Sequence, residues 1–167
     1  MTLTKVALLA IGLLSAAACA PAATGPAMNF AEAPAAEPAA PAIPLHPNET
    51  PQLRALINAT ADRYDIPRTL LHRVIIREST HRPGTRNRPY YGLMQILPAT
   101  ARTMGFTGAP SDLLDAETNL TYAGKYLRGA WLLANGSEAE AVKWYSRGYY
   151  YEAKRRGMLV ETGLRKG

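Results

Sequence analysis

Glu78 ends a stretch of sequence in which apolar residues recur with the period of a helix. Leu71, Val74, Ile75 and Glu78 are spaced i, i+3, i+4 and i+7, so a helix would place the carboxyl on its apolar face. Burial on such a face disfavours the charged form and raises the pKa of a carboxyl. A glutamic acid that stays protonated near neutral pH can give its proton to a leaving oxygen. The spacing also fits an exposed Glu78, or one paired with a neighbouring arginine.

The sequence lacks the residue patterns that several other common catalytic chemistries require. A single cysteine, Cys19, excludes an internal disulfide framework and a Cys-cluster zinc site. His46, His72 and His81 lie far apart in the sequence without metal-ligand spacing, which argues against a zinc hydrolase. Neither GxGxxG nor GxxxxGK[ST] occurs, which argues against nucleotide chemistry. The sequence therefore predicts a protein with no metal and no other cofactor.

Four short motifs follow one another along the chain. They are Glu78-Ser79, Gly92-Leu93-Met94-Gln95-Ile96, Asn119-x-x-x-Ala123-Gly124-x-Tyr126-Leu127 and Ala141-x-x-Trp144-Tyr145. Their order and spacing resemble the lytic transglycosylase catalytic domain, which is lysozyme-like and related to goose-type lysozyme. The resemblance covers about Leu53 to Tyr150. GLMQ alone is a weak signal, whereas four motifs in order are a specific one.

The resemblance implies a role for each matching residue. Glu78 aligns with the catalytic acid/base of the family. Met94 would contact a sugar face and Gln95 would hydrogen-bond the glycan, although Met94 also fits as a core residue. The implied substrate-binding residues are Ser79, Gly92, Leu93, Met94, Gln95, Asn119, Tyr126 and Tyr145. Ser146 stands where the family usually has an asparagine, which puts one polar contact near the acid in doubt.

The resemblance also implies a mechanism that needs one acid. Most glycosidases use two carboxyl groups, ~5–5.5 Å apart for retention or ~6.5–9.5 Å apart for inversion. The stretch from Ser79 to Ser111 contains no Asp or Glu, so a local partner for Glu78 is missing, although a distant acid could fold back. In the family, the glutamate protonates the glycosidic oxygen and then, as a base, activates the C6 hydroxyl of the same sugar. The implied product has a 1,6-anhydro ring on N-acetylmuramic acid (MurNAc).

Start and stop signals for helices predict an all-α, lysozyme-like domain. Helices are expected from Thr50-Pro51, from Pro67 to about Glu78, from Pro98 to Gly105, from Asp115 to Ala134 and from Ser137 to about Arg147. Ser137 and Glu140 form a predicted capping box. No stretch alternates with the period of a strand, so only a small irregular ribbon is expected between Ser79 and Tyr91.

The first 48 residues differ in composition from the rest. Residues 1–20 have a positive start, a short apolar run and small residues, which predicts an export signal, with a buried N-terminal helix as the alternative. Cys19 follows three alanines, as in a bacterial lipoprotein signal, so we expect a lipidated Cys19; simple cleavage nearby is the competing reading. Residues 21–48 are rich in Ala and Pro and predict a disordered linker. The catalytic domain is expected at 49–167.

The net charge of +6 favours an anionic partner. An export signal argues against nucleic acid, and anionic cell-wall material explains the charge equally well. We therefore expect peptidoglycan glycan strands as the partner of a periplasmic protein, held at the membrane by Cys19. Two alternatives stay open: a hydrolytic muramidase like goose-type lysozyme, and a non-catalytic peptidoglycan-binding lipoprotein. Whether the protein serves wall turnover or a secretion machine is not fixed by the sequence.

Overall fold

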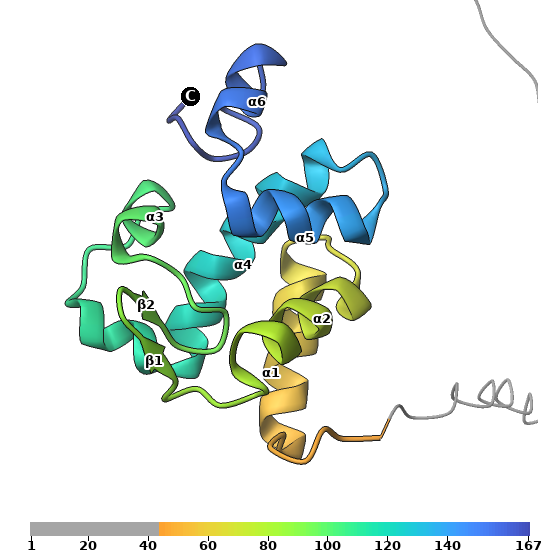
Figure 1. The fold of residues 1–167 in the computed structure, drawn as a ribbon, viewed down its shortest axis with the longest axis vertical. Coiled ribbons are helices and arrows are strands. Elements are labelled where there is room, and N and C mark those ends of the chain that lie inside the picture. The colour runs from red at the N-terminus through yellow and green to blue at the C-terminus, as the bar shows by residue number, and fades with distance from the viewer. Residues whose placement is uncertain (1–43) are drawn as a thin grey trace, which may run out of the picture. The chain divides into compact units, whose positions relative to one another are not determined.

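A computed structural model describes residues 44–167 of the chain, and these residues form a helical body (Figure 1). The predicted export signal, Cys19 and most of the predicted linker lie outside the described residues. The helices are α1 (Pro51–Arg63), α2 (Arg68–Ser79), α3 (Pro98–Thr103), α4 (Ala116–Leu133), α5 (Glu138–Arg147) and α6 (Tyr150–Arg155), with a 3₁₀ helix, η1 (Pro110–Leu114). Strands β1 (Arg86–Asn87) and β2 (Tyr90–Tyr91) pair antiparallel. The predicted all-α class with a small ribbon is confirmed.

Helix starts lie where the sequence predicts them. Thr50 Oγ1 accepts a hydrogen bond from the Leu53 backbone N–H, and Asp115 Oδ1 accepts one from that of Thr118. Ser137 Oγ accepts from the backbone N–H of Glu140 at the start of α5. Each side chain satisfies an N–H group that the first turn of a helix leaves without a partner.

Two short helices were not expected from the sequence. The 3₁₀ helix η1 begins with Pro110, and Asp112 Oδ2 accepts a hydrogen bond from the Ala109 backbone N–H, whereas α6 lacks a side-chain cap hydrogen bond. Helix α6 is instead fixed by packing, since Tyr149 at its N-cap is 1% exposed and stacks on Tyr126 with ring centroids 4.6 Å apart. Tertiary contacts therefore determine α6.

Helix α4 runs through the middle of the body in Figure 1 and packs against α1, α3, α5 and η1. Its buried face includes Leu120, Leu127 and Leu133. Helix α2 packs on α1 and α5 through Leu71, Val74 and Ile75, which are at most 1% exposed. Among the described residues, no helix is both long and apolar enough to cross a membrane.

Candidate active site

Glu78 lies in the last turn of α2, at the end of the apolar stripe that the sequence predicts. Its side chain keeps 24% of its surface exposed, and Arg77 Nε lies 3.7 Å from its Oε1. Burial raises the pKa of Glu78, and the nearby Arg77 charge opposes that rise without cancelling it. The carboxyl is therefore open enough to meet a substrate and shielded enough to hold a proton at a higher pH than an exposed glutamate.

A cavity of about 380 Å³ opens in front of Glu78. Residues from α2, the β1–β2 ribbon, the following loop and α5 line it: Arg77, Glu78, Asn87, Tyr90, Gln95, Tyr145 and Ser146. Glu78 is the one carboxylate among these described lining residues. The cavity thus joins the first, second and fourth sequence motifs around a single acid.

The loop 92–96 that follows β2 is shaped by a glycine. Gly92 has φ +75°, and a Cβ there would lie 2.2 Å from both Asn119 Nδ2 and Leu113 O. Any other residue would need a rarely populated backbone conformation and would collide with these two groups. The glycine therefore lets the loop close against α4 and η1.

Asn119 and Tyr145 hold this loop from two sides. Asn119 is fully buried; its Oδ1 accepts from Met94 N at 2.9 Å, and its Nδ2 donates to Tyr91 O and Leu113 O at 2.8 Å. Tyr145 Oη donates to Met94 O at 2.8 Å. Residues from the third and fourth motifs thus bind the N–H and the C=O of one residue in the second, which fixes the floor of the cavity.

The side chain of Gln95 lines the cavity and also hydrogen-bonds the backbone of the ribbon and the following loop. Its φ of +47° is left-handed, and its side-chain Nε2 donates to Thr85 O at 3.0 Å and Gly92 O at 2.8 Å. Its Oε1 accepts from Asn87 N at 3.3 Å. Because the amide already closes the ribbon, a hydrogen bond from Gln95 to a glycan stays a prediction.

The remaining predicted site residues lie behind the cavity wall. Leu93 and Met94 are fully buried, and Ser79 is 6% exposed with its Oγ donating to Ile75 O. Tyr126 packs edge-on against Tyr145, with ring centroids 5.5 Å apart. These side chains do not line the cavity, so the contact expected between Met94 and a sugar face has no exposed surface to make it. Their part in substrate binding stays a prediction.

Three cavity residues were not singled out by the sequence. Asn87 and Tyr90 belong to the ribbon, and Arg77 precedes the acid on α2. The only available signal for Asn87 and Tyr90 was their position between the first two motifs, in a loop whose path the sequence does not define, and for Arg77 it was its place next to Glu78. Ser146 lines the cavity as well, and its Oγ donates to Val142 O at 2.6 Å.

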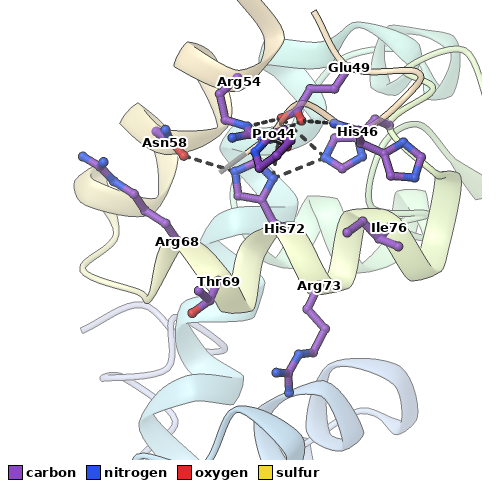
Figure 2. A pocket seen from close by; sticks show the side chains of 11 residues that line it. Pro44, His46, Glu49, Arg54, Asn58, Arg68, Thr69, His72, Arg73 and Ile76 are labelled. Atoms are coloured by element: carbon purple, nitrogen blue, oxygen red, sulfur yellow. Dashed lines mark hydrogen bonds and ion pairs between the residues drawn. The ribbon is translucent and has the colours of Figure 1, made fainter. Parts of the chain in front are cut away.

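A second, larger cavity of about 720 Å³ is lined by residues of α1, of α2 and of the segments next to these helices (Figure 2). Glu78 does not line it. All three histidines line it, together with Glu49. Although the histidines lie far apart in the sequence, the fold brings them together in this cavity. Glu49, His72 and His81 offer ligand atoms that all lie within 4.8 Å of one another.

Residues 55–156 match the family model described as the Transglycosylase SLT domain, which spans most of the described chain. The chain therefore belongs to this family, and its helical body is a lytic transglycosylase catalytic domain, a glycan-cleaving enzyme whose substrate is peptidoglycan. The chain has no match among curated proteins or solved structures.

Proposed function

We propose that this domain cleaves the β-1,4 bond between MurNAc and N-acetylglucosamine (GlcNAc) without consuming water. Glu78 is the single acid/base, and the product carries a 1,6-anhydro-MurNAc end. The observation that carries the proposal is the cavity chemistry: one half-buried carboxyl with a raised pKa and no second carboxylate among the described lining residues.

The first step breaks the glycosidic bond. Protonated Glu78 gives its proton to the oxygen that joins the two sugars, so GlcNAc leaves with a free 4-hydroxyl. The N-acetyl group of MurNAc stabilises the positive charge that develops at the anomeric carbon. Glu78 is left as a carboxylate.

The second step closes the anhydro ring. The Glu78 carboxylate takes the proton from the C6 hydroxyl of MurNAc while the C6 oxygen bonds to the anomeric carbon. This restores the protonated acid, and no water is incorporated. A second carboxylate is unnecessary because the substrate supplies both the stabilising group and the nucleophile.

Product analysis tests this proposal. The full chain is incubated with purified peptidoglycan, and the released muropeptides are identified by mass spectrometry. Anhydro-ended products are expected. Products with reducing ends, heavier by one water, would assign the domain to the hydrolytic alternative, and no release by a folded protein would favour the non-catalytic binding alternative.

We further propose that the protein is exported to the periplasm and anchored by lipid on Cys19. The support is the composition of residues 1–20 and the Ala/Pro-rich segment after it, which would act as a tether. The intact mass of membrane-extracted protein tests this: a lipidated Cys19 as the first residue is expected, and an unmodified terminus elsewhere would contradict it.

A further inference from the structure

Glu49, His72 and His81 come from three segments that meet beside α2. Glu49 precedes α1, His72 lies in the middle of α2, and His81 follows its last turn. Glu49 and His81 are at most 7% exposed. Figure 2 shows His72 pointing from α2 towards Glu49, with Asn58 of α1 beside it.

The three ligand atoms form a compact triangle. His72 Nδ1 lies 3.3 Å from His81 Nε2, and Glu49 Oε1 lies 3.6 Å from each of these nitrogens. Zinc binds nitrogen and oxygen ligands at about 2.0–2.2 Å in a tetrahedron, whose ligand atoms are then about 3.3–3.6 Å apart. The observed separations match that range without any movement of the backbone.

Neighbouring groups prepare His72 and Glu49 as ligands. His72 Nε2 lies 3.1 Å from Asn58 Oδ1, which can only accept, so this nitrogen carries the proton and Nδ1 keeps its electron pair. That pair accepts a hydrogen bond from His81 Nε2, so His81 can bind a metal through Nε2 once its proton moves to Nδ1. Such a hydrogen bond from the distal ring nitrogen is usual for metal-binding histidines. Arg54 donates to both carboxylate oxygens of Glu49 and fixes their orientation.

The charge of the site also fits a cation. Arg54 and the His46 backbone N–H donate hydrogen bonds to the buried Glu49 carboxyl, which supplies the negatively charged ligand of the three. The positive charge of Arg54 opposes an incoming ion, so we expect it to weaken the affinity.

We propose that Glu49, His72 and His81 bind a divalent transition-metal ion, with Zn²⁺ as the best fit. Three protein ligands leave the fourth tetrahedral position to a water or small anion in the larger cavity. The ion would tie the segment before α1 to α2 and to the turn that follows Glu78. Its role is structural, since Glu78 lines a different cavity.

Calorimetric titration of the full chain with ZnCl₂ after removal of metal by EDTA tests the proposal. A Cys19→Ser background removes the one thiol, which could bind zinc by itself. We expect one ion per chain and a melting temperature that rises with Zn²⁺ concentration. Co²⁺ in place of Zn²⁺ should give the strong visible absorption of a tetrahedral site.

His72→Gln should weaken Zn²⁺ binding at least tenfold and abolish the cobalt absorption. His46→Ala is the matched control: His46 lines the same cavity but is outside the triangle, so this variant should bind like the background protein. Circular dichroism checks folding, and His81→Gln answers the same question if His72→Gln unfolds. Absence of Zn²⁺ binding, or equal binding by folded His72→Gln, would overturn the proposal.

Discussion

Glu78 and Glu49 are both shielded carboxyls, yet their pKa values move in opposite directions. Burial raises the pKa of Glu78, and Arg77, the one charge that acts on it among residues 44–167, is 3.7 Å away. Burial would also raise the pKa of Glu49, but Arg54 and the His46 N–H donate to it directly and His81 adds favourable charge, so its pKa falls to about 2. Burial alone therefore does not keep a carboxyl protonated. The pKa of a buried carboxyl rises only where few hydrogen-bond donors stabilise its charged form.

The largest expected effect comes from removing the proton of Glu78. Glu78→Gln keeps the shape of the side chain but cannot transfer a proton, so glycan cleavage should fall by at least ~10⁴-fold, because one group serves as acid and base. The rate of muropeptide release from purified peptidoglycan measures this. Glu140→Gln, on α5 but outside the cavity lining, is the control and should cleave normally. A folded Glu78→Gln variant with near-normal release would rule out the assignment.

The pH dependence of cleavage follows from the direction of the shift. The acid step needs protonated Glu78, so the rate should decline as pH rises through a pKa that lies above the ordinary value of 4.5. Rates measured across a pH series on the same substrate check this. An activity that keeps increasing into the alkaline range would show that another group supplies the proton.

Removing Arg54, which donates hydrogen bonds to Glu49, tests how the environment of Glu49 differs from that of Glu78. Arg54→Met leaves a buried carboxylate without its ion-pair partner, which we expect to lower the free energy of unfolding by about 3 kcal/mol at pH 7. Glu49 stabilises the fold above its unfolded pKa of about 4.5, and this contribution is lost as pH falls towards 2. The deficit of Arg54→Met should therefore shrink in acid. Urea unfolding at several pH values measures it.

Arg68→Met is the matched control for that experiment. Arg68 also donates two hydrogen bonds to one carboxylate, that of Asp62, but both side chains are more than half exposed. Exposed ion pairs contribute little to stability, so this variant should unfold almost like the wild type. If both variants lost the same free energy of unfolding, burial would not make the Arg54–Glu49 pair more stabilising than the exposed Arg68–Asp62 pair.

The helices could be predicted from the sequence because their signals are local. Thr50, Asp115 and Ser137 each cap the helix that follows within four residues. The apolar stripe likewise placed Glu78 on the correct face of α2. The contacts of Asn119 and Tyr145 with Met94 could not be predicted, because they join residues that are distant in the sequence. The meeting of the three histidines was missed for the same reason.

A smaller effect is expected from Tyr145→Phe. Tyr145 Oη donates to Met94 O and not to Glu78, so its loss should loosen the cavity floor without moving the pKa of the acid. A buried carbonyl left without its donor costs about 1–3 kcal/mol, and we expect activity to fall about tenfold. The alkaline side of the pH–rate profile should stay in place. A displaced profile would show that Tyr145 shares the proton of Glu78.

The smallest expected effect is that of Glu78→Gln on the melting temperature. Because the folded state raises the pKa of Glu78, it loses stability relative to the unfolded chain as pH rises from 4.5 through the folded pKa. Glu78→Gln removes that loss, so the variant should melt at a slightly higher temperature than the wild type at pH 7 and at the same temperature near pH 4. Calorimetric melting of both proteins at the two pH values tests this.

The opposite shifts of the two glutamates can be measured directly by a carboxyl-carbon NMR titration of ¹³C-glutamate-labelled protein. Loss of one signal in Glu78→Gln assigns that residue, and Glu49 is assigned as the signal displaced in Arg54→Met. We expect Glu78 to titrate above 4.5 and Glu49 at about 2. A Glu78 midpoint at or below 4.5, or one below that of Glu49, would contradict the account of Glu78 as the protonated acid of this domain.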